Sequence, residues 1–295
     1  MSLYAYRVFE IVAQQKSFAK ASTVLNLTPS AVSHLIAKLE DEFGLKLFIR
    51  SRSGVALTNE GERLRPLIRN IQHGSELLKQ EIDQIHGLAS GTVRLGTFNS
   101  VSVRWLPQII KSFRALYPDI DIQIFQGGYN DILSWIKTNT VDLAFVVNNI
   151  AKDMNVIPLH NDKLVCIAPN EYAPNKAGLI TIEEIKSMNL ILQRDGYNAE
   201  VIDLFSKYNM NIYSSYNVEN DDSIISMVEA GFGFCIVSEM VTNGILNDVQ
   251  ILRFTPDEYR LIGLVTADPH SIAPATKKMR QHIISFLEDR DLMNV

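Results

Sequence analysis

The fold of the N-terminal part of the chain is decided by the stretch Ser17–Arg50, SFAKASTVLNLTPSAVSHLIAKLEDEFGLKLFIR. Ser17 can cap a first helix, because its side-chain oxygen accepts from a free backbone N–H. The apolar side of this helix follows at helical spacing and consists of Phe18, Ala21 and Leu25. Thr28 can cap a second helix, with Pro29 at the first helical position, where its missing N–H costs nothing. Two short helices joined by two residues predict a helix-turn-helix.

The second helix has one apolar face and one polar face. The apolar stripe consists of Val32, Ile36, Leu39 and Phe43. The opposite face is small, polar and basic, and it carries Ser30, Ser33, His34, Ala37 and Lys38. Gly44 ends the helix. Beyond it, residues 46–50 and 55–57 flank Ser-Arg-Ser-Gly, which predicts a β-hairpin wing.

The next segment, residues 58–88, predicts a helix that pairs with a second copy of itself. Thr58 can cap it, and Glu60 and Glu62 in its first turn suit the helix dipole. A heptad-like seam recurs along it, formed by Leu64, Ile68, Ile71, Leu78, Ile82 and Ile85. The alternative is that this stripe packs against the protein's own body. Gly74 and Ser75 interrupt the seam, so we expect a short contact.

From Gly91 onward, strands and helices alternate. Strands at 92–98, 120–124 and 142–147, with helices between them and Ser100 as the first helix cap, predict a mostly parallel sheet. The alternation continues through strands near 164–168, 190–193, 213–218, 232–237 and 261–266 and helices near 199–208, 223–230 and 275–287. We expect two α/β units, the second inserted between the sheet and the final helix of the first.

Composition and charge narrow the function classes. The 295 residues suffice for about two domains. Residues 1–70 hold ten Lys and Arg against six acids, a net charge of +4, so the remaining residues carry −9 of the total of −5. A basic head on an acidic body predicts that the head meets a polyanion, with chance clustering as the alternative.

The sequence does not show the patterns of a membrane span, a signal peptide, a metal site or a common catalytic motif. No apolar run approaches the ~20 residues of a membrane span, and the opening MSLYAYRVFE does not have the pattern of a signal peptide. We therefore expect a cytoplasmic protein with no membrane partner. The six histidines fall outside metal-ligand spacing, and the sequence has neither GxSxG nor a Walker motif. We therefore expect that the protein is not an enzyme and binds neither a metal nor a cofactor. We interpret Cys166 and Cys235 as core residues, with redox sensing as the alternative.

The segment Ser17–Arg50, followed by Val55–Leu64 (VALTNEGERL), closely resembles the LysR-type transcriptional regulators. The resemblance is specific in order and spacing over about the first 65 residues. The remainder fits that family's effector domain, with its best local matches at Leu106-Pro107, 142–144, Asn220-Asp221 and 228–233. Ser22 stands where the family has the second of two alanines, and serine is small enough to keep the close helix packing.

The resemblance implies three parts: an all-α winged helix-turn-helix at 1–57, a dimerisation linker helix at 58–88, and an effector domain at 91–295. The effector domain would be a two-lobed, periplasmic-binding-protein-like α/β fold, with lobe I at 91–161 and 267–295 and lobe II at 162–266. Implied partners are double-stranded DNA, a second copy (dimer or tetramer), a small molecule and RNA polymerase. A solute-binding protein with an unrelated helical head is the alternative, and an enzyme on this fold is a third.

The candidate DNA-binding residues lie on the second helix and the wing. Side chains in the first half of a helix reach base edges in the major groove, which favours Ser30, Ser33 and His34. Basic side chains beside these residues would neutralise the charge of DNA phosphates without reading the base sequence. The full set is Thr28, Pro29, Ser30, Ser33, His34, Lys38, Arg50 and Arg52.

The candidate effector-binding residues lie where strands end and helices begin, because ligands bind at that edge of an α/β sheet. In the resembled family, Ser100 aligns with a common effector contact. The full set is Asn99, Ser100, Val101, Ser102, Gln126, Gly127, Gly128, Gln193, Arg194, Tyr197, Asn198 and Asn220. Donors outnumber acids in this set, which predicts a small anion such as a carboxylate, held at Ser100 and reached by Gln193 or Arg194. Ordinary caps and turns are the alternative.

Overall fold

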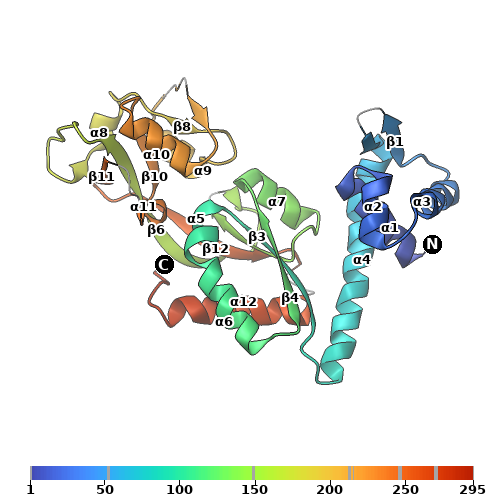
Figure 1. Cartoon of the computed structure of the whole chain (residues 1–295). Helices are drawn as coiled ribbons and strands as arrows, with labels where there is room; N and C mark the ends of the chain where they lie inside the picture. The colour runs from blue at the N-terminus through green and yellow to red at the C-terminus, as the bar shows by residue number, and fades with distance from the viewer. Residues whose placement is uncertain are drawn as a thin grey trace. The chain divides into compact units, whose positions relative to one another are not determined.

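The computed structural model describes residues 2–51, 54–147, 150–211, 214, 216–244, 248–268 and 272–294. The chain divides into two compact units (Figure 1). The first consists of Met1–Gly91 and Thr138–Thr140, and the second of Thr92–Lys137 and Val141–Val295. No helix in the described part of the chain is long and apolar enough to cross a membrane.

The first unit contains three short helices, a hairpin and one long helix. These are α1 (Leu3–Gln15), α2 (Phe18–Leu25), α3 (Pro29–Phe43), β1 (Phe48–Ser51), β2 (Gly54–Leu57) and α4 (Asn59–Ile85). The predicted caps are confirmed: Ser17 accepts from the N–H of Lys20, Thr28 from that of Ala31 and Thr58 from that of Gly61. Gly44 ends α3 with a φ of 65°, in the left-handed region that favours glycine. The predicted wing is the antiparallel pair β1–β2.

Helix α1 is the element of this unit that the sequence reasoning did not assign. Its apolar face, which includes Val8, Phe9 and Val12, is fully buried against α2, α3 and α4. The available signal was the cap at Ser2, whose hydroxyl accepts from the N–H of Tyr4.

The seam on α4 differs from its prediction at two of its residues, Leu64 and Ile68. Ile68 is 3% exposed and belongs to the core of the first unit, and Leu64 packs against that core. Leu67, which the heptad pattern did not include, is 57% exposed. At 100° per residue, Leu67, Ile71, Leu78, Ile82 and Ile85 fall within about 60° of one another. These five residues, all exposed in the single chain, are here called the α4 stripe.

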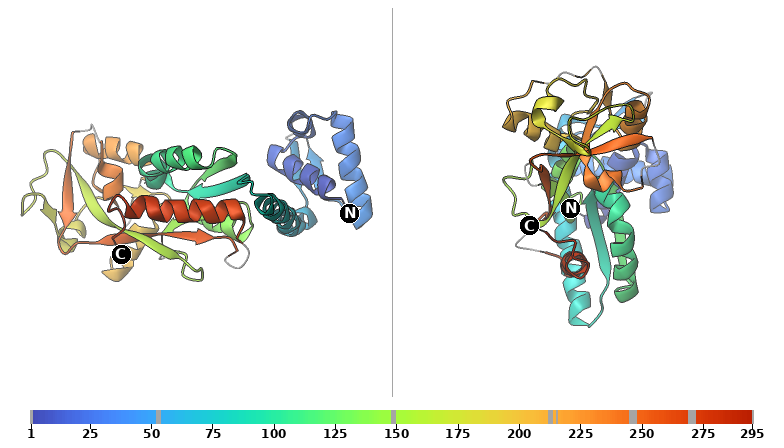
Figure 2. Two further views of the ribbon diagram at one scale, coloured as in Figure 1. Left: turned by 90° about the horizontal axis from the view of Figure 1, so that it is seen from below. Right: turned by 90° about the vertical axis from the view of Figure 1, so that its left-hand side faces the viewer.

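The second unit is built from a sheet that joins two lobes. The first lobe contains β3 (Gly91–Thr97), α5 (Asn99–Arg104), α6 (Leu106–Leu116), β4 (Ile120–Gln126), α7 (Tyr129–Lys137), β5 (Leu143–Val147) and α12 (Pro274–Glu288). The second lobe contains β7 (Leu179–Ile180), α8 (Ile182–Ile185), β8 (Leu192–Gln193), α9 (Ala199–Lys207), β9 (Asn217–Val218), α10 (Asp221–Glu229), β10 (Cys235–Ser238), α11 (Glu239–Thr242) and β11 (Val249–Phe254). Helix α12 packs against α6 along the first lobe (Figure 2).

Two long strands run through both lobes. They are β6 (Ile157–Pro169) and β12 (Tyr259–Thr266), and they pair with each other antiparallel. The strand order is β4-β3-β5-β12-β6-β11-β7, with β10 also on β6. Strand β3 is parallel to β5, but β12 is antiparallel to both of its neighbours. The parallel pairing predicted for the first strands is confirmed for β3 and β5. The sheet as a whole is mixed, because β12 runs antiparallel to β5 and β6, and β10 and β11 run antiparallel to β6.

The lobes have separate cores. In the first lobe the fully buried Phe113 and Phe145 lie in one cluster. The second lobe has one cluster on each face of β6 and β10. Cys166 belongs to one of these clusters and Cys235 to the other, so the two thiols lie on opposite faces of the paired strands. Their interpretation as core residues is confirmed, and burial raises the pKa of both thiols.

Candidate functional site

The predicted DNA-binding face is the exposed side of α3. Thr28, Pro29, Ser30, His34 and Lys38 are exposed, and Ser33 is half-buried. The hydroxyls of Thr28 and Ser30 are 3.0 Å apart, within hydrogen-bond distance at the start of the helix. A helix that presents short polar side chains in its first two turns has the shape that the major groove admits.

Arg50 of the wing is tied to this helix. Its Nη2 donates to the hydroxyl of Ser33 at 2.8 Å, and its guanidinium lies 4.3 Å from the centre of the Phe18 ring. One arginine thus connects β1, α3 and α2. Arg52, the other predicted wing base, lies outside the described residues.

A buried carboxylate fixes the turn between α3 and the wing. Glu40 accepts from the Nζ of Lys46 at 2.7 Å and from the backbone N–H groups of Leu47 at 2.8 Å and Phe48 at 3.2 Å. Burial opposes ionisation of Glu40, but these hydrogen bonds outweigh it and lower the pKa of the carboxyl. The wing therefore starts from a defined point at the end of α3.

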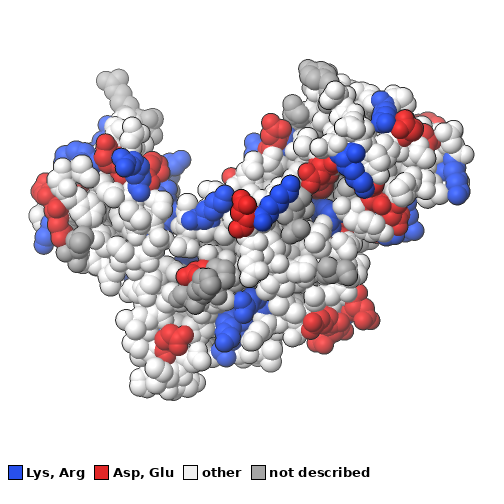
Figure 3. All heavy atoms as spheres, turned by 180° about the vertical axis from the view of Figure 1, so that it is seen from behind, with Lys and Arg blue, Asp and Glu red and all other residues white. Residues whose placement is uncertain are grey.

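Two bases of the basic head are engaged inside the first unit. Glu10 of α1 accepts from Arg65 at 2.9 Å and from Arg69 at 2.6 Å, both on α4. The side chains of Arg65 and Arg69 are mostly buried between helices. The positive charge that residues 1–70 can present to a polyanion is therefore smaller than their net charge of +4. Figure 3 shows acidic and basic side chains interspersed over the visible face of the chain.

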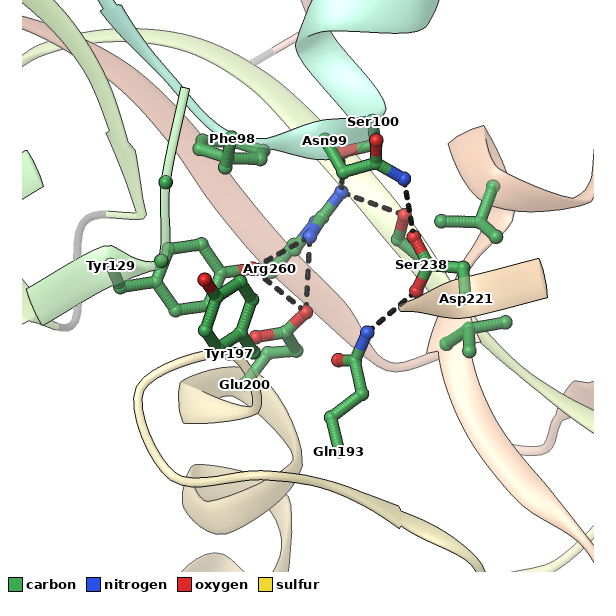
Figure 4. A pocket seen from close by; sticks show the side chains of 14 residues that line it. Phe98, Asn99, Ser100, Tyr129, Gln193, Tyr197, Glu200, Asp221, Ser238 and Arg260 are labelled. Atoms are coloured by element: carbon green, nitrogen blue, oxygen red, sulfur yellow. Dashed lines mark hydrogen bonds and ion pairs between the residues drawn. The ribbon is translucent and has the colours of Figure 1, made fainter. Parts of the chain in front are cut away.

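The second unit holds a small cavity between its lobes that is partly open to solvent. Arg260 of β12 is at its centre (Figure 4). Its guanidinium donates to Asp162 at 2.9 and 2.7 Å and to Glu200 at 3.0 Å. It also donates to the hydroxyls of Tyr129, Ser100 and Ser238, at 2.9, 2.7 and 2.7 Å. Every side of this buried cation is therefore saturated by the protein's own acceptors.

A second carboxylate joins the lobes at the rim of the cavity. Asp221 begins α10, and it accepts from the Nδ2 of Asn99 at 2.9 Å and from the Nε2 of Gln193 at 2.6 Å. Asn99 belongs to the first lobe, whereas Gln193 and Asp221 belong to the second. Burial raises the pKa of Asp221, although both amides and Arg260 act in the opposite direction. The amides that the sequence offered for an effector are thus held by an internal carboxylate.

The structure brings together half of the predicted effector residues. Those that line the cavity are Asn99, Ser100, Gly127, Gly128, Gln193 and Tyr197. Those that do not line it are Val101, Ser102, Gln126, Arg194, Asn198 and Asn220. Their contacts explain this: Asn220 caps α10 through the N–H of Ser223, and Arg194 lies against Tyr197 and Glu219 with half of its side chain in solvent.

The structure bears on two further expectations about this site. Ser100 is not a helix cap, because α5 begins one residue earlier and the Ser100 hydroxyl accepts from Arg260. The count of donors over acids, on which the expected anionic effector rested, left out the carboxylates of the site, and the charge of the effector stays a prediction. Around the cavity lie the carboxylates of Asp162, Glu200 and Asp221, against the single guanidinium of Arg260.

Sequence reasoning missed the residues at the centre of the site. They are Tyr129, Asp162, Glu200, Asp221, Ser238 and Arg260. One signal was available: Arg260 is the only charge in the otherwise apolar strand sequence YRLIGLVT, and a charge within a buried strand requires partners. Within the described residues, the structure shows no cluster of three or more His, Cys, Asp or Glu side chains that could hold a metal.

Comparisons with known proteins cover both units. Residues 86–288 match the LysR substrate binding domain, and residues 3–62 match the bacterial regulatory helix-turn-helix protein, lysR family. An uncharacterised HTH-type transcriptional regulator of Bacillus subtilis, YvbU, is 29% identical over 280 residues, which is 94% of this chain and 96% of that protein.

Two solved structures share the fold of most of the chain. A full-length variant of OxyR from Pseudomonas aeruginosa has a TM-score of 0.72 at 19% identity and covers 96% of this chain and 94% of its own. Full-length CbnR complexed with its target DNA has a TM-score of 0.67 at 16% identity and covers 96% of this chain and 99% of its own.

Proposed function

Because the chain belongs to the LysR family of helix-turn-helix transcriptional regulators, we propose that it binds operator DNA through α3 and the wing and responds to a small molecule in the cleft of its second unit. The observation that supports a response to a small molecule is the Arg260 network, in which both lobes bind one buried side chain. A ligand that rearranges this network changes the relation of the lobes. Such a change gives a bound molecule a route to the rest of the chain.

On the DNA, we propose that Ser30, Ser33 and His34 contact base edges. Lys38, Arg50 and Arg52 would contact phosphates, with Thr28 and Pro29 close to the backbone. The exposure of α3 and the fixed start of the wing support this division. Arg50 donates to the Ser33 hydroxyl, so under this proposal a phosphate contact and a base contact would be coupled through one hydrogen bond.

In the assembly, we propose that the α4 stripe pairs with the same stripe of a second copy, giving a dimer or a tetramer. Exposure of five large apolar side chains on one helix face to water is unfavourable, and pairing of two helices would bury them. The proposed domain limits are 1–57 for DNA binding, 58–88 for assembly and 91–295 for the effector. A regulator of this kind would work in the cytoplasm, with RNA polymerase as a further partner.

The test is selection of operator fragments from genomic DNA by the full chain, followed by footprinting. We expect protection of a defined site, and affinity for it that exceeds affinity for random DNA by at least ~10³-fold, as for specific binders in general. The variant Ser33→Ala should change the selected sequence, whereas Glu183→Gln, on an exposed turn of α8, should not. Equal affinity for all fragments contradicts the regulator proposal.

A further inference from the structure

One acceptor in the cleft has no donor. Glu200 is 6% exposed, and its Oε1 accepts from the Tyr129 hydroxyl and from Arg260, both at 3.0 Å. Its other oxygen, Oε2, is buried without any hydrogen-bond partner among the described residues. Figure 4 shows this carboxylate among the side chains that line the cavity. A buried carboxylate oxygen left without a donor costs free energy, and a bound group that donates to it recovers that cost.

The charge of the cleft points in the same direction. Asp162, Glu200 and Asp221 bring three negative charges to the network, and Arg260 brings one positive charge. Arg260 is the only base that lines this cavity among the described residues. Arg194 is paired with Glu219 outside the cavity, and Lys207, on a neighbouring pocket that Glu200 also lines, is paired with Glu258. The cleft therefore has an excess of negative charge in a place where water is scarce, and electrostatic interactions are strong there.

The walls suit an organic cation. Phe98, Tyr129 and Tyr197 line the cavity, and ring faces attract cations. The protein already uses this property, because the guanidinium of Arg260 lies 5.2 Å from the centre of the Phe98 ring. Arg260 itself reaches only Oε1 of Glu200, so it leaves the second oxygen for another donor.

We propose that the cleft takes a small organic cation, whose ammonium group donates to Oε2 of Glu200. The proposal rests on the proposed function, because it names the ligand class of the same cleft. A carboxylate ligand is disfavoured, since it would add a charge to the existing excess and compete with Asp162 and Glu200 for a guanidinium that is already saturated. Burial raises the pKa of Glu200, and a bound cation would stabilise its ionised form.

The experiment uses isothermal titration at neutral pH and constant KCl concentration to measure the affinity of the full chain for three probes that share a four-carbon chain. The probes are n-butylamine, n-butanol and n-butyrate. We expect n-butylamine to bind at least tenfold more tightly than n-butanol, and n-butyrate to bind more weakly than either. Glu200→Gln places a donor near the position of Oε2, so it should lower the affinity for n-butylamine at least tenfold.

The control is Glu183→Gln, which removes the same charge from an exposed site on α8 and should leave amine binding unchanged. The proposal is overturned if n-butyrate binds more tightly than n-butylamine, if Glu200→Gln keeps the affinity of the parent chain, or if none of the probes binds. Operator binding is measured on the same samples. Anion binding that Ser100→Ala abolishes, with operator binding intact, would leave the regulator proposal standing and remove only the ligand class.

Discussion

Arg260 shows how a single residue organises the effector unit. Its side chain is 4% exposed, and its carboxylate partners Asp162 and Glu200 are 2% and 6% exposed. Taking these charges out of water is expensive, and the hydrogen bonds must offset that cost. The network is therefore sensitive to the loss of any one member, and most of all to the loss of the guanidinium.

We predict that Arg260→Met destabilises the second unit by about 3–5 kcal/mol, because it leaves two buried carboxylates without their cation. The measurement is urea denaturation of the full chain, followed by a signal from the second unit. The matched control is Arg253→Met, because Arg253 is mostly exposed and makes one long ion pair, 3.4 Å, with Glu239. Its cost should be below about 1 kcal/mol. Equal costs for both variants would show that the network contributes little.

The contact of Arg50 with Ser33 carries a second prediction. Arg50→Ala should weaken binding to operator and random DNA alike and reduce the salt slope by about one unit, because a phosphate contact is lost. Ser33→Ala should change operator preference instead. If the hydrogen bond persists on DNA, a double-mutant cycle of the two should give a coupling of about 0.5–1.5 kcal/mol. Zero coupling would mean that Arg50 leaves Ser33 when DNA binds. Lys38→Ala, which has no such contact, serves as the additive control.

Helix α4 shows how one element serves two surfaces. Ile68 faces the core of the first unit, whereas the α4 stripe, only one helix face away, remains exposed. The glycine at 74 lies on the same side as the stripe and divides it into two parts. The helix is therefore anchored at its start and available for pairing along most of its length.

We predict that Ile71→Asp dissociates the assembly, since it places an unpaired carboxylate in a desolvated contact. Sedimentation velocity at several concentrations measures this. Gln84→Asp adds the same charge to an exposed position at least about 100° around α4 from every residue of the stripe, and it should leave the oligomer intact. An unchanged oligomer for Ile71→Asp would mean that the stripe does not pair.

The contact between α1 and α4 predicts a pH dependence. Burial opposes ionisation of Glu10, but Arg65 and Arg69 lower its pKa below the usual 4.5. A carboxyl whose pKa is lowered on folding stabilises the folded state above its unfolded pKa and loses that contribution as the pH falls through the folded value. The first unit should therefore lose stability as the pH falls below about 4.5. Glu10→Gln should cost about 1–3 kcal/mol at pH 7 and flatten the acid limb of the stability curve.

At the scale of the whole molecule, the second unit consists of two lobes that are connected by β6 and β12 and held together across the cleft by polar contacts. The Nε of Arg104 in the first lobe also donates to the carbonyl of Met240 in the second, at 2.8 Å. Contacts of this kind are few compared with those inside each core, so the lobes can respond as separate bodies. The closed state of the cleft thus depends on a small number of hydrogen bonds between the lobes, such as those of Asn99, Arg104 and Arg260.

We predict that Asn99→Ala favours an open cleft, because it removes the hydrogen bond from the first lobe to Asp221. The loss should be about 1 kcal/mol, or roughly a fivefold gain in the open population. Hydrogen exchange measured by mass spectrometry over residues 98–104 and 190–197 should show faster exchange. Gln126→Ala is the control, since Gln126 donates to Asn99 without reaching Asp221. Equal protection in both variants would show that this bond does not hold the lobes together.

The sequence by itself determined the elements whose causes are local. The caps at Ser17, Thr28 and Thr58, the end of α3 at Gly44 and the wing depend on residues a few positions apart, so spacing alone reveals them. The same holds for the alternating strands and helices of the second unit. The resemblance of Ser17–Leu64 to a known family added the arrangement of the three parts.

Only the tertiary structure decided the centre of the cleft and the direction of β12. The partners of Arg260 lie between 22 and 160 positions away along the chain, so no spacing rule connects them. Tertiary packing also decides that Ile68 is buried in the core while Leu67 belongs to the exposed α4 stripe. It also places Cys166 and Cys235 on opposite faces of the paired strands. The side-chain amides of Asn99 and Gln193 both donate to Asp221, 122 and 28 positions away, so the sequence could not show that these groups already have an internal acceptor. Which charges meet in a buried site is set by packing, because burial makes each one depend on partners that the local sequence does not contain.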